Sequence, residues 1–211
     1  MARFFRISLV LAIVGMFAAT AAMANIPDPA LSNCPAFLTI TPDGSFTYTV
    51  TVNGATGPVN GSLVEIRVSA QADPVVCWCV GQVHPSITAV TNASGEADFN
   101  IAGGGCVSAA GLGGGAVVAQ VLADGIELCQ IEINSPDAVD SGGFLPTDDD
   151  YVGDANCVVG LADAVFHTGP IAGGTAEVCS NFTDPYDDTV ALGDAVIVTP
   201  YIVNGTSCVA Q

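Results

Sequence analysis

The sequence predicts a mainly β protein that ends in a small helical module. Across residues 31–134, apolar and polar residues alternate in short stretches separated by glycine, proline and asparagine. Further on, LADAV at 161–165 recurs as LGDAV at 192–196. Alternation with period two is typical of half-buried strands, and an internal repeat is typical of a duplicated unit. We therefore expect an antiparallel β-sandwich followed by two loop–helix units.

The first 24 residues have the features of a secretory signal peptide. Arg3 and Arg6 form a basic start, an apolar run follows from Ile7, and Ala22 and Ala24 mark a cleavage site. The alternative, an uncleaved anchor helix, fits less well because the run is short for a span of about 20 residues. We expect a secreted protein that is extracellular or attached to the cell surface.

The strands of the β region are predicted from alternation and turn residues. In SFTYTVTV at 45–52, Phe46 and Tyr48 share one face with two valines, and serine and threonines occupy the other. The glycine-rich stretch 103–116 is expected to be a flexible loop. No helical period occurs before residue 135, so we expect about six to eight strands in a sandwich. Further strands are predicted in 37–40 and in 62–70, a strand, a turn and a second strand in 86–103, and a hairpin in 116–134.

The charge of the chain is strongly negative. It has 21 acidic residues against three basic ones, and two of these three, Arg3 and Arg6, belong to the predicted signal peptide. Such a chain lacks the cations that bind phosphates, so it is not expected to bind nucleic acid or anionic membranes. Crowded carboxylates favour divalent cations as partners, although scattered acids also serve as a solubilising surface.

The cysteines are expected to form disulfides because the chain is expected to be exported. Metal ligation is the alternative, but the spacing in CWC at 77–79 does not match a zinc knuckle. Five cysteines precede residue 137 and three follow it, so pairing within one chain requires at least one disulfide between the two regions. The connectivity stays open. The cysteines are Cys34, Cys77, Cys79, Cys106, Cys129, Cys157, Cys179 and Cys208.

Two stretches of the β region resemble immunoglobulin-like modules of bacterial secreted proteins. They are GPVNGSLVEIRVS at 57–69 and TNASGEADFNI at 91–101, which the resemblance makes a strand and a hairpin. The resemblance implies a sandwich fold over 25–136 but no particular function, because such modules serve many roles.

The region 150–211, after an acidic linker at 137–149, resembles a dockerin type I-like module. Its repeat LADAV and LGDAV stands where such a module has a duplicated, EF-hand-like calcium loop running into a helix. The resemblance implies oxygen ligands at loop positions 1, 3, 5 and 12, glycine at position 6 and an apolar residue at 8 that pairs the two loops. The helices are expected to stop at Gly169-Pro170 and near Pro200.

An ungapped alignment assigns the loop positions. With Asp163 at position 12, positions 1, 3, 5, 6 and 8 are Val152, Asp154, Asn156, Cys157 and Val159. With Asp194 at position 12, they are Thr183, Pro185, Asp187, Asp188 and Val190. The candidate metal ligands are Asp154, Asn156 and Asp163, with Asp150 upstream, in the first loop, and Asp187 and Asp194, with Asp184, in the second.

The ligand sets of both loops are incomplete. Both lack the glycine at position 6, the first has no oxygen at position 1 and the second has none at position 3. Fewer carboxylates weaken calcium binding, so we expect Ca²⁺ to bind weakly at one or both loops. The alternative is that disulfides hold the loops in place of a metal.

The predicted function is binding without catalysis. His84 and His167 lie near no nucleophile motif, and His167 is expected to end a short helix, where a cation suits the helix dipole. Trp78 is expected to plug a disulfide, with a sugar platform as the alternative. The dockerin resemblance implies a protein partner of the cohesin type. The competing functions are a self-associating subunit of a fibre or surface layer, and a carbohydrate-binding module.

Overall fold

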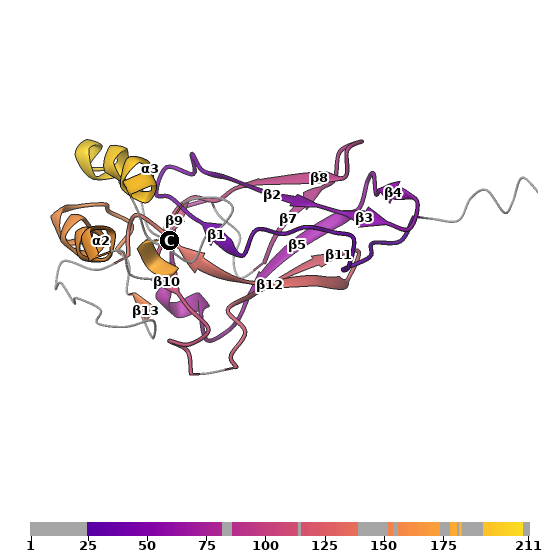
Figure 1. Cartoon of the computed structure of the whole chain (residues 1–211), viewed down its shortest axis with the longest axis horizontal. Helices are drawn as coiled ribbons and strands as arrows, with labels where there is room; N and C mark the ends of the chain where they lie inside the picture. The colour runs from indigo at the N-terminus through magenta and orange to yellow at the C-terminus, as the bar shows by residue number, and fades with distance from the viewer. Residues whose placement is uncertain are drawn as a thin grey trace, which may run out of the picture.

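The chain is mainly β, as predicted, and its described α-helices lie near the C-terminal end. The computed structural model describes residues 25–81, 86–113, 115–138, 152–153, 156–173, 178–180, 182 and 192–208. Helices α2 (Leu161–Gly173) and α3 (Leu192–Asn204) lie together at one end of the β region (Figure 1). The short hairpin of β3 (Asn53–Gly54) and β4 (Gly57–Pro58) lies at the opposite end.

The largest sheet has the strand order β13-β10-β12-β11-β5-β7, and β1 also pairs with β12. All pairs along that path are antiparallel, whereas β1 runs parallel to β12, with Phe37 opposite Glu132. The expectation of a wholly antiparallel region is therefore wrong for β1. The strands are β1 (Phe37–Thr39), β5 (Leu63–Val68), β7 (Ser86–Val90), β10 (Cys106–Val107), β11 (Ala119–Ala123), β12 (Ile126–Asn134) and β13 (Val152–Gly153).

Three further sheets are two-stranded, and the β3–β4 hairpin is one of them. Strand β2 (Thr47–Thr51) pairs with β8 (Glu96–Asn100), and β6 (Cys77–Trp78) pairs with β9 (Gly103–Gly104). Two 3-10 helices complete the described elements, η1 (Asp73–Val75) and η2 (Val178–Ser180).

One apolar core joins the β2–β8 sheet to the large sheet. Tyr48 and Val50 of β2 are buried in the same cluster as Val64 and Ile66 of β5. Alternate residues along each strand enter this cluster because successive side chains of a strand point to opposite faces. The predicted alternation in 45–52 and 62–70 is thus confirmed.

The strand, turn and strand predicted in 86–103 are present, but the hairpin that the immunoglobulin resemblance implies in 91–101 is wrong. Strand β7 pairs with β5, and β8 pairs with β2, so the two strands belong to different sheets. The chain turns between them at Asn92, whose side chain accepts hydrogen bonds from the N–H groups of Ser94 and Glu96. Gly95 (φ 78°) lies so close to Val52 that a Cβ would be 2.5 Å from its carbonyl oxygen. At this turn the chain therefore passes from the large sheet to the β2–β8 sheet instead of forming a hairpin.

The hairpin of β11 and β12 is confirmed. Its tip is formed by Asp124 and Gly125, both with positive φ, at 49° and 83°. The Asp124 carboxylate accepts hydrogen bonds from the Leu63 N–H and the Ser62 hydroxyl, each at 2.9 Å. These bonds tie the hairpin tip to the start of β5.

The first part of the glycine-rich stretch is strand, not the expected flexible loop. Residues Gly103 to Val107 are buried and form β9 and β10. A Cβ on Gly103 would lie 2.6 Å from the carbonyl oxygen of Cys77 in the neighbouring strand. Glycine is needed there because the two backbones approach so closely.

Candidate functional site

Three disulfides fasten the C-terminal region to the β region. They are Cys77–Cys157, Cys79–Cys208 and Cys106–Cys179, whereas Cys34–Cys129 lies within the β region. The prediction of at least one disulfide between the regions is confirmed, because three disulfides join them. Four disulfides also fit a protein that matures in an oxidising compartment. No helix among the described residues is long and apolar enough to span a membrane.

The CWC motif anchors two of these bridges side by side. The sulfur atoms of Cys79, Cys157 and Cys208 lie within 4.8 Å of one another, and all three are disulfide-bonded. The cluster is therefore a pair of adjacent bridges, with no free thiolate for a metal. Trp78 between them is 5% exposed, and its indole N–H donates to Asp73 at 2.9 Å. This burial fits the expectation that Trp78 packs against a disulfide, and its ring is not exposed for a sugar to stack on.

The first loop turns at Cys157, which takes the place of glycine. Cys157 has a φ of 64°, the left-handed conformation that glycine adopts most readily. Beside it, the Asn156 side-chain oxygen accepts a hydrogen bond from the Val158 N–H at 2.9 Å. The backbone shape expected at position 6 is thus present without the glycine. Asp150 and Asp154 lie outside the described residues.

Asp163 begins α2 and joins it to the end of β12. One carboxylate oxygen accepts a hydrogen bond from the Gly160 N–H at 2.8 Å, and the other accepts one from the Ala138 N–H at 3.0 Å. The first bond is half of a capping box, in which the third helical residue reaches back to the N-cap. Asp163 is buried, so both bonds are shielded from water.

Asp194 has the corresponding place in α3. It is buried, and its carboxylate accepts a hydrogen bond from the Phe182 N–H at 2.6 Å. Like Asp163, it is the third residue of its helix, and both carboxylates offer the oxygen chemistry that Ca²⁺ prefers. Asp184 and Asp187 lie outside the described residues.

The first loop pairs with the segment that follows α3. The Val159 N–H donates to Thr206 at 2.8 Å, and the Cys208 N–H donates to Cys157 at 3.0 Å. Val158 and Ser207 form an antiparallel bridge between these bonds. The expected partner of Val159, Val190 in the second loop, lies outside the described residues.

Both helices are longer than predicted. Helix α2 continues through Gly169-Pro170 to Gly173, and α3 continues through Pro200 to Asn204. Proline inside a helix removes one backbone hydrogen bond and costs about 3 kcal/mol. The apolar residues beyond each proline include Ile171 and Ile202, which line a common groove between the helices. Contacts between α2 and α3 offset this cost, and the local sequence signal does not contain them.

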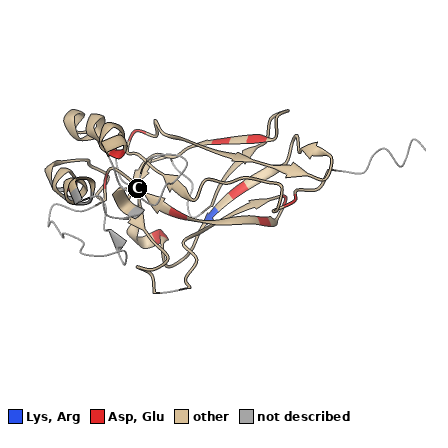
Figure 2. Ribbon diagram, viewed as in Figure 1, with Lys and Arg blue, Asp and Glu red and all other residues tan. Residues whose placement is uncertain are grey.

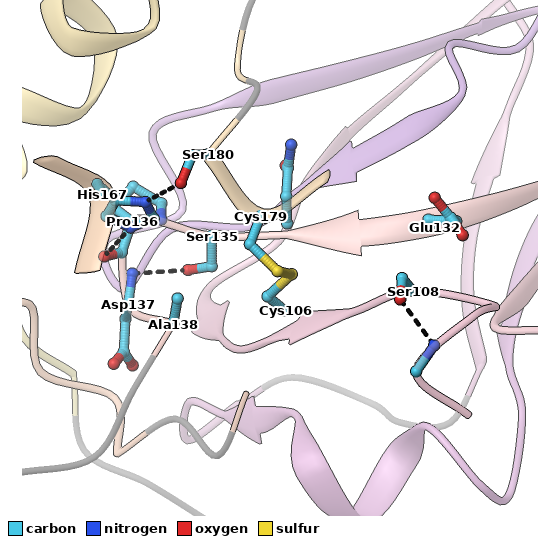
Figure 3. Close-up of a disulfide and its surroundings, with 12 residues drawn as sticks. Cys106, Ser108, Glu132, Ser135, Pro136, Asp137, Ala138, His167, Cys179 and Ser180 are labelled. Atoms are coloured by element: carbon cyan, nitrogen blue, oxygen red, sulfur yellow. Dashed lines mark hydrogen bonds between the residues drawn. A yellow bond between two sulfur atoms is a disulfide. The ribbon is translucent and has the colours of Figure 1, made fainter. Parts of the chain in front are cut away.

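His167 is a buried structural residue, and the expectation of a cation at the end of a helix is wrong. Its Nε2 atom lies 3.1 Å from the Pro136 carbonyl and its Nδ1 atom 3.0 Å from the Ser180 hydroxyl (Figure 3). A carbonyl only accepts, so Nε2 carries the proton and Nδ1 accepts from Ser180. Burial lowers the pKa of His167 to about 4, which keeps the ring neutral. His84 lies outside the described residues.

The two helices expose the same apolar residues at equivalent positions of the repeat. Leu161 and Leu192 are 81% and 78% exposed, and Val165 and Val196 are 53% and 68% exposed. Each pair is related by the 31-residue repeat offset. The one charged residue in each helix is a buried aspartate, so both helices are drawn largely in tan in Figure 2. Repetition makes this an organised surface, which we call the helix face.

A groove of about 240 Å³ separates the helices beside the helix face. The Thr168 and Thr199 hydroxyls each donate to the carbonyl four residues earlier, at 2.5 Å, so their methyl groups remain for contact. The groove is lined in repeat-related pairs by Ala164 and Ala195, His167 and Val198, Thr168 and Thr199, Ile171 and Ile202, together with Ala172.

Sequence reasoning missed Asp137, which the structure places beside the first loop. Asp137 is buried, and the residue after it, Ala138, is the one bound by Asp163. It stands in the predicted linker, 26 residues before Asp163, so an ungapped loop alignment cannot include it. No protein-family model matches the chain, and no curated protein or solved structure matches it either.

Proposed function

We propose that the chain is a secreted, non-catalytic binding protein whose helix face docks to a protein partner. In this proposal, an immunoglobulin-like sandwich carries a dockerin-like pair of loop–helix units, and calcium or disulfides hold the two helices in place. The sheets that share one core support the first part. The left-handed Cys157 and the two equivalent aspartates support the second.

The repeated exposure of Leu161, Val165, Leu192 and Val196 is the observation that carries the docking function. Exposed apolar patches of this kind mark interaction sites, whereas single exposed apolar residues are ordinary. An uncharged face within a chain of 21 acids suits a partner with an apolar centre and a basic rim. The dockerin resemblance makes a cohesin-type domain the first partner to test.

Exchanging Val165 and Val196 together for glutamate is expected to weaken binding to a cohesin-type domain at least tenfold. Two charges would then be buried in an apolar contact, which corresponds to a loss of at least about 1.4 kcal/mol. Isothermal titration calorimetry against purified cohesin-type domains measures the change. Equal binding by this variant and the wild type would remove the helix face from the proposal.

A fibre or surface-layer subunit is the second candidate, because β7 ends the described strand order of the large sheet. An edge strand can pair with a second chain. Val90 of β7 is 61% exposed, so Val90→Glu is the matched control. Light scattering coupled to size-exclusion chromatography distinguishes the two functions. A docking protein is monomeric and indifferent to Val90→Glu, whereas a fibre subunit assembles and loses assembly in that variant.

Calcium is expected to raise the melting temperature relative to excess EDTA. A ligand that binds only the folded state adds about 2.7 kcal/mol to the free energy of unfolding at one hundred times its Kd. Asp163→Ala and Asp194→Ala should each reduce the shift, whereas Asp98→Ala on the exposed side of β8 should not. Differential scanning calorimetry gives the answer, and an unchanged melting temperature at millimolar Ca²⁺ would count against calcium in both loops.

A further inference from the structure

A buried carboxylate without a partner lies next to the first loop. Asp137 is 0% exposed, and neither of its carboxylate oxygens has a hydrogen-bond partner among the described residues. Its carboxylate points away from Ser135 and His167 (Figure 3). A buried carboxylate in this condition is costly unless another group neutralises it. The environment of Asp137 therefore points to a missing ligand.

Asp163 is the acidic neighbour of Asp137. Ala138 donates its N–H to Asp163 at 3.0 Å, which brings the two carboxylates together. Burial, followed by the charge of Asp163, raises the pKa of Asp137 to about 7. Asp163 is itself buried and accepts two backbone hydrogen bonds. Two buried acidic side chains therefore lie close together at this point.

Among the described residues, no cationic side chain is available to neutralise Asp137. It contains no lysine, and Arg3 and Arg6 belong to the predicted signal peptide. The remaining arginine, Arg67 on β5, is bound to Glu65 at 2.9 Å. His167 is held neutral by burial. A cation from solution is the group that remains.

The first loop offers Asp137 a specific place. Val152, at position 1, has no side-chain oxygen, and its backbone pairs with Val107 in the sheet. Strand β10 pairs with β13 on one side and with β12 on the other, so the chain leaving β12 reaches Asp137 beside the start of the loop. The N–H groups of loop positions 5 to 7, residues 156–158, lie near enough to lower the pKa of Asp137 in part, although none completes a hydrogen bond.

The close fit around Asp137 depends on Gly104 of β9. A Cβ on Gly104 would lie 2.0 Å from an Asp137 carboxylate oxygen. The strand thus leaves space for the carboxylate where any other residue would fill it. The position of Asp137 is therefore fixed by the sheet rather than by the loop.

We propose that Asp137 supplies the carboxylate that the first loop lacks, so that one Ca²⁺ ion binds between Asp137 and Asp163. The ligand comes from the predicted linker after β12, outside the loop sequence. This inference rests on the calcium binding in the proposed function and adds a ligand to it. Oxygen donors of two carboxylates suit a hard divalent cation, and the ion neutralises both.

The test is a calorimetric titration of the purified protein with CaCl₂. Asp137→Asn is expected to lower the affinity of the first site at least tenfold, and Asp98→Asn on β8 is the matched control with no effect. In EDTA at pH 8, Asp137→Asn should melt at or above the wild-type temperature, because the amide removes a buried charge. Higher stability without calcium, together with lost calcium binding, is the signature of a ligand.

A second measurement needs no variant. The side-chain carboxyl ¹³C signal of Asp137 should shift during the CaCl₂ titration and saturate with the same Kd as the calorimetry. Wild-type affinity in Asp137→Asn, or an unmoved Asp137 signal, would overturn the inference. Its failure leaves docking intact, because cohesin-domain binding is measured separately. Likewise, failure of docking leaves Asp137 as a ligand, because the titration contains no partner.

Discussion

Replacing the six cysteines of the three joining disulfides by serine is expected to release the helical region from a folded β region. The bridges Cys77–Cys157, Cys79–Cys208 and Cys106–Cys179 close chain segments of 80, 129 and 73 residues. Closing a loop of about 100 residues stabilises the folded state by roughly 4–5 kcal/mol in the chain-entropy account. Whichever bridge forms first contributes most to the stability, because it shortens the loops that the other two close.

The helical region has little core of its own to compensate for this loss. The main apolar cluster contains no described residue beyond Ile133. Among the described residues of the helical region, the buried apolar ones are Cys157, Val159, Cys179, Phe182 and Val198. Two of these five, Cys157 and Cys179, form the bridges themselves. We therefore expect α2 and α3 to lose their protection against hydrogen exchange before the strands do.

Hydrogen exchange followed by mass spectrometry, with limited proteolysis, measures this release. The matched control replaces Cys34 and Cys129, whose bridge lies within the β region. That control should lower the stability of the strands and keep the helices attached. Wild-type protection of α2 and α3 in the six-serine variant would show that packing, and not the bridges, holds the helical region.

The stability of the protein is expected to fall by about 3 kcal/mol through His167 as the pH drops from 7 to 4. The pKa of His167 is about 4 in the folded protein, against 6.5 for an ordinary histidine. Between these values the unfolded chain binds a proton that the folded protein excludes, so acid favours unfolding. The stability that depends on a neutral His167 is fully present above pH 6.5 and is lost as the pH falls towards 4.

The readout is the difference between the wild type and His167→Gln. Asp137 titrates in the opposite sense, because its raised pKa of about 7 makes the folded state less stable as the pH rises towards 7. Subtracting the two urea-denaturation profiles removes that contribution. An NMR titration in a His84→Gln background isolates the His167 imidazole. A folded-state pKa near 6.5 would contradict the prediction.

Much of the β region could be predicted because its signals are local. Alternation placed β2 and β5, and Asp124-Gly125 placed the β11–β12 hairpin. The pairing of β7 and β8 could not be predicted, because a turn sequence reports a change of direction but not the sheet that the next strand joins. The parallel contact of β1 with β12 joins segments about 95 residues apart, which no local pattern records.

In the candidate site, too, local signals identified some residues and missed those whose roles depend on remote contacts. Asp163 and Asp194 were found because each repeats a position, and the structure gives both the same place at a helix start. Asp137 and His167 were missed or misread because their roles come from groups remote in sequence, such as Gly104 for Asp137 and Ser180 for His167. Helix ends were placed too early because proline is a local signal and the groove contacts are not.

The bridge at Cys157 also limits how far a pull on the helices can travel. Without it, the chain from Pro136 to Leu161 could be pulled out to a full length of roughly 80–90 Å, at about 3.3–3.6 Å for each residue. With Cys157 bonded to Cys77 in β6, only the few residues up to Leu161 remain free to lengthen. A partner bound to α2 would thus transmit tension to the sheets through a covalent bond, and only a short segment could lengthen first.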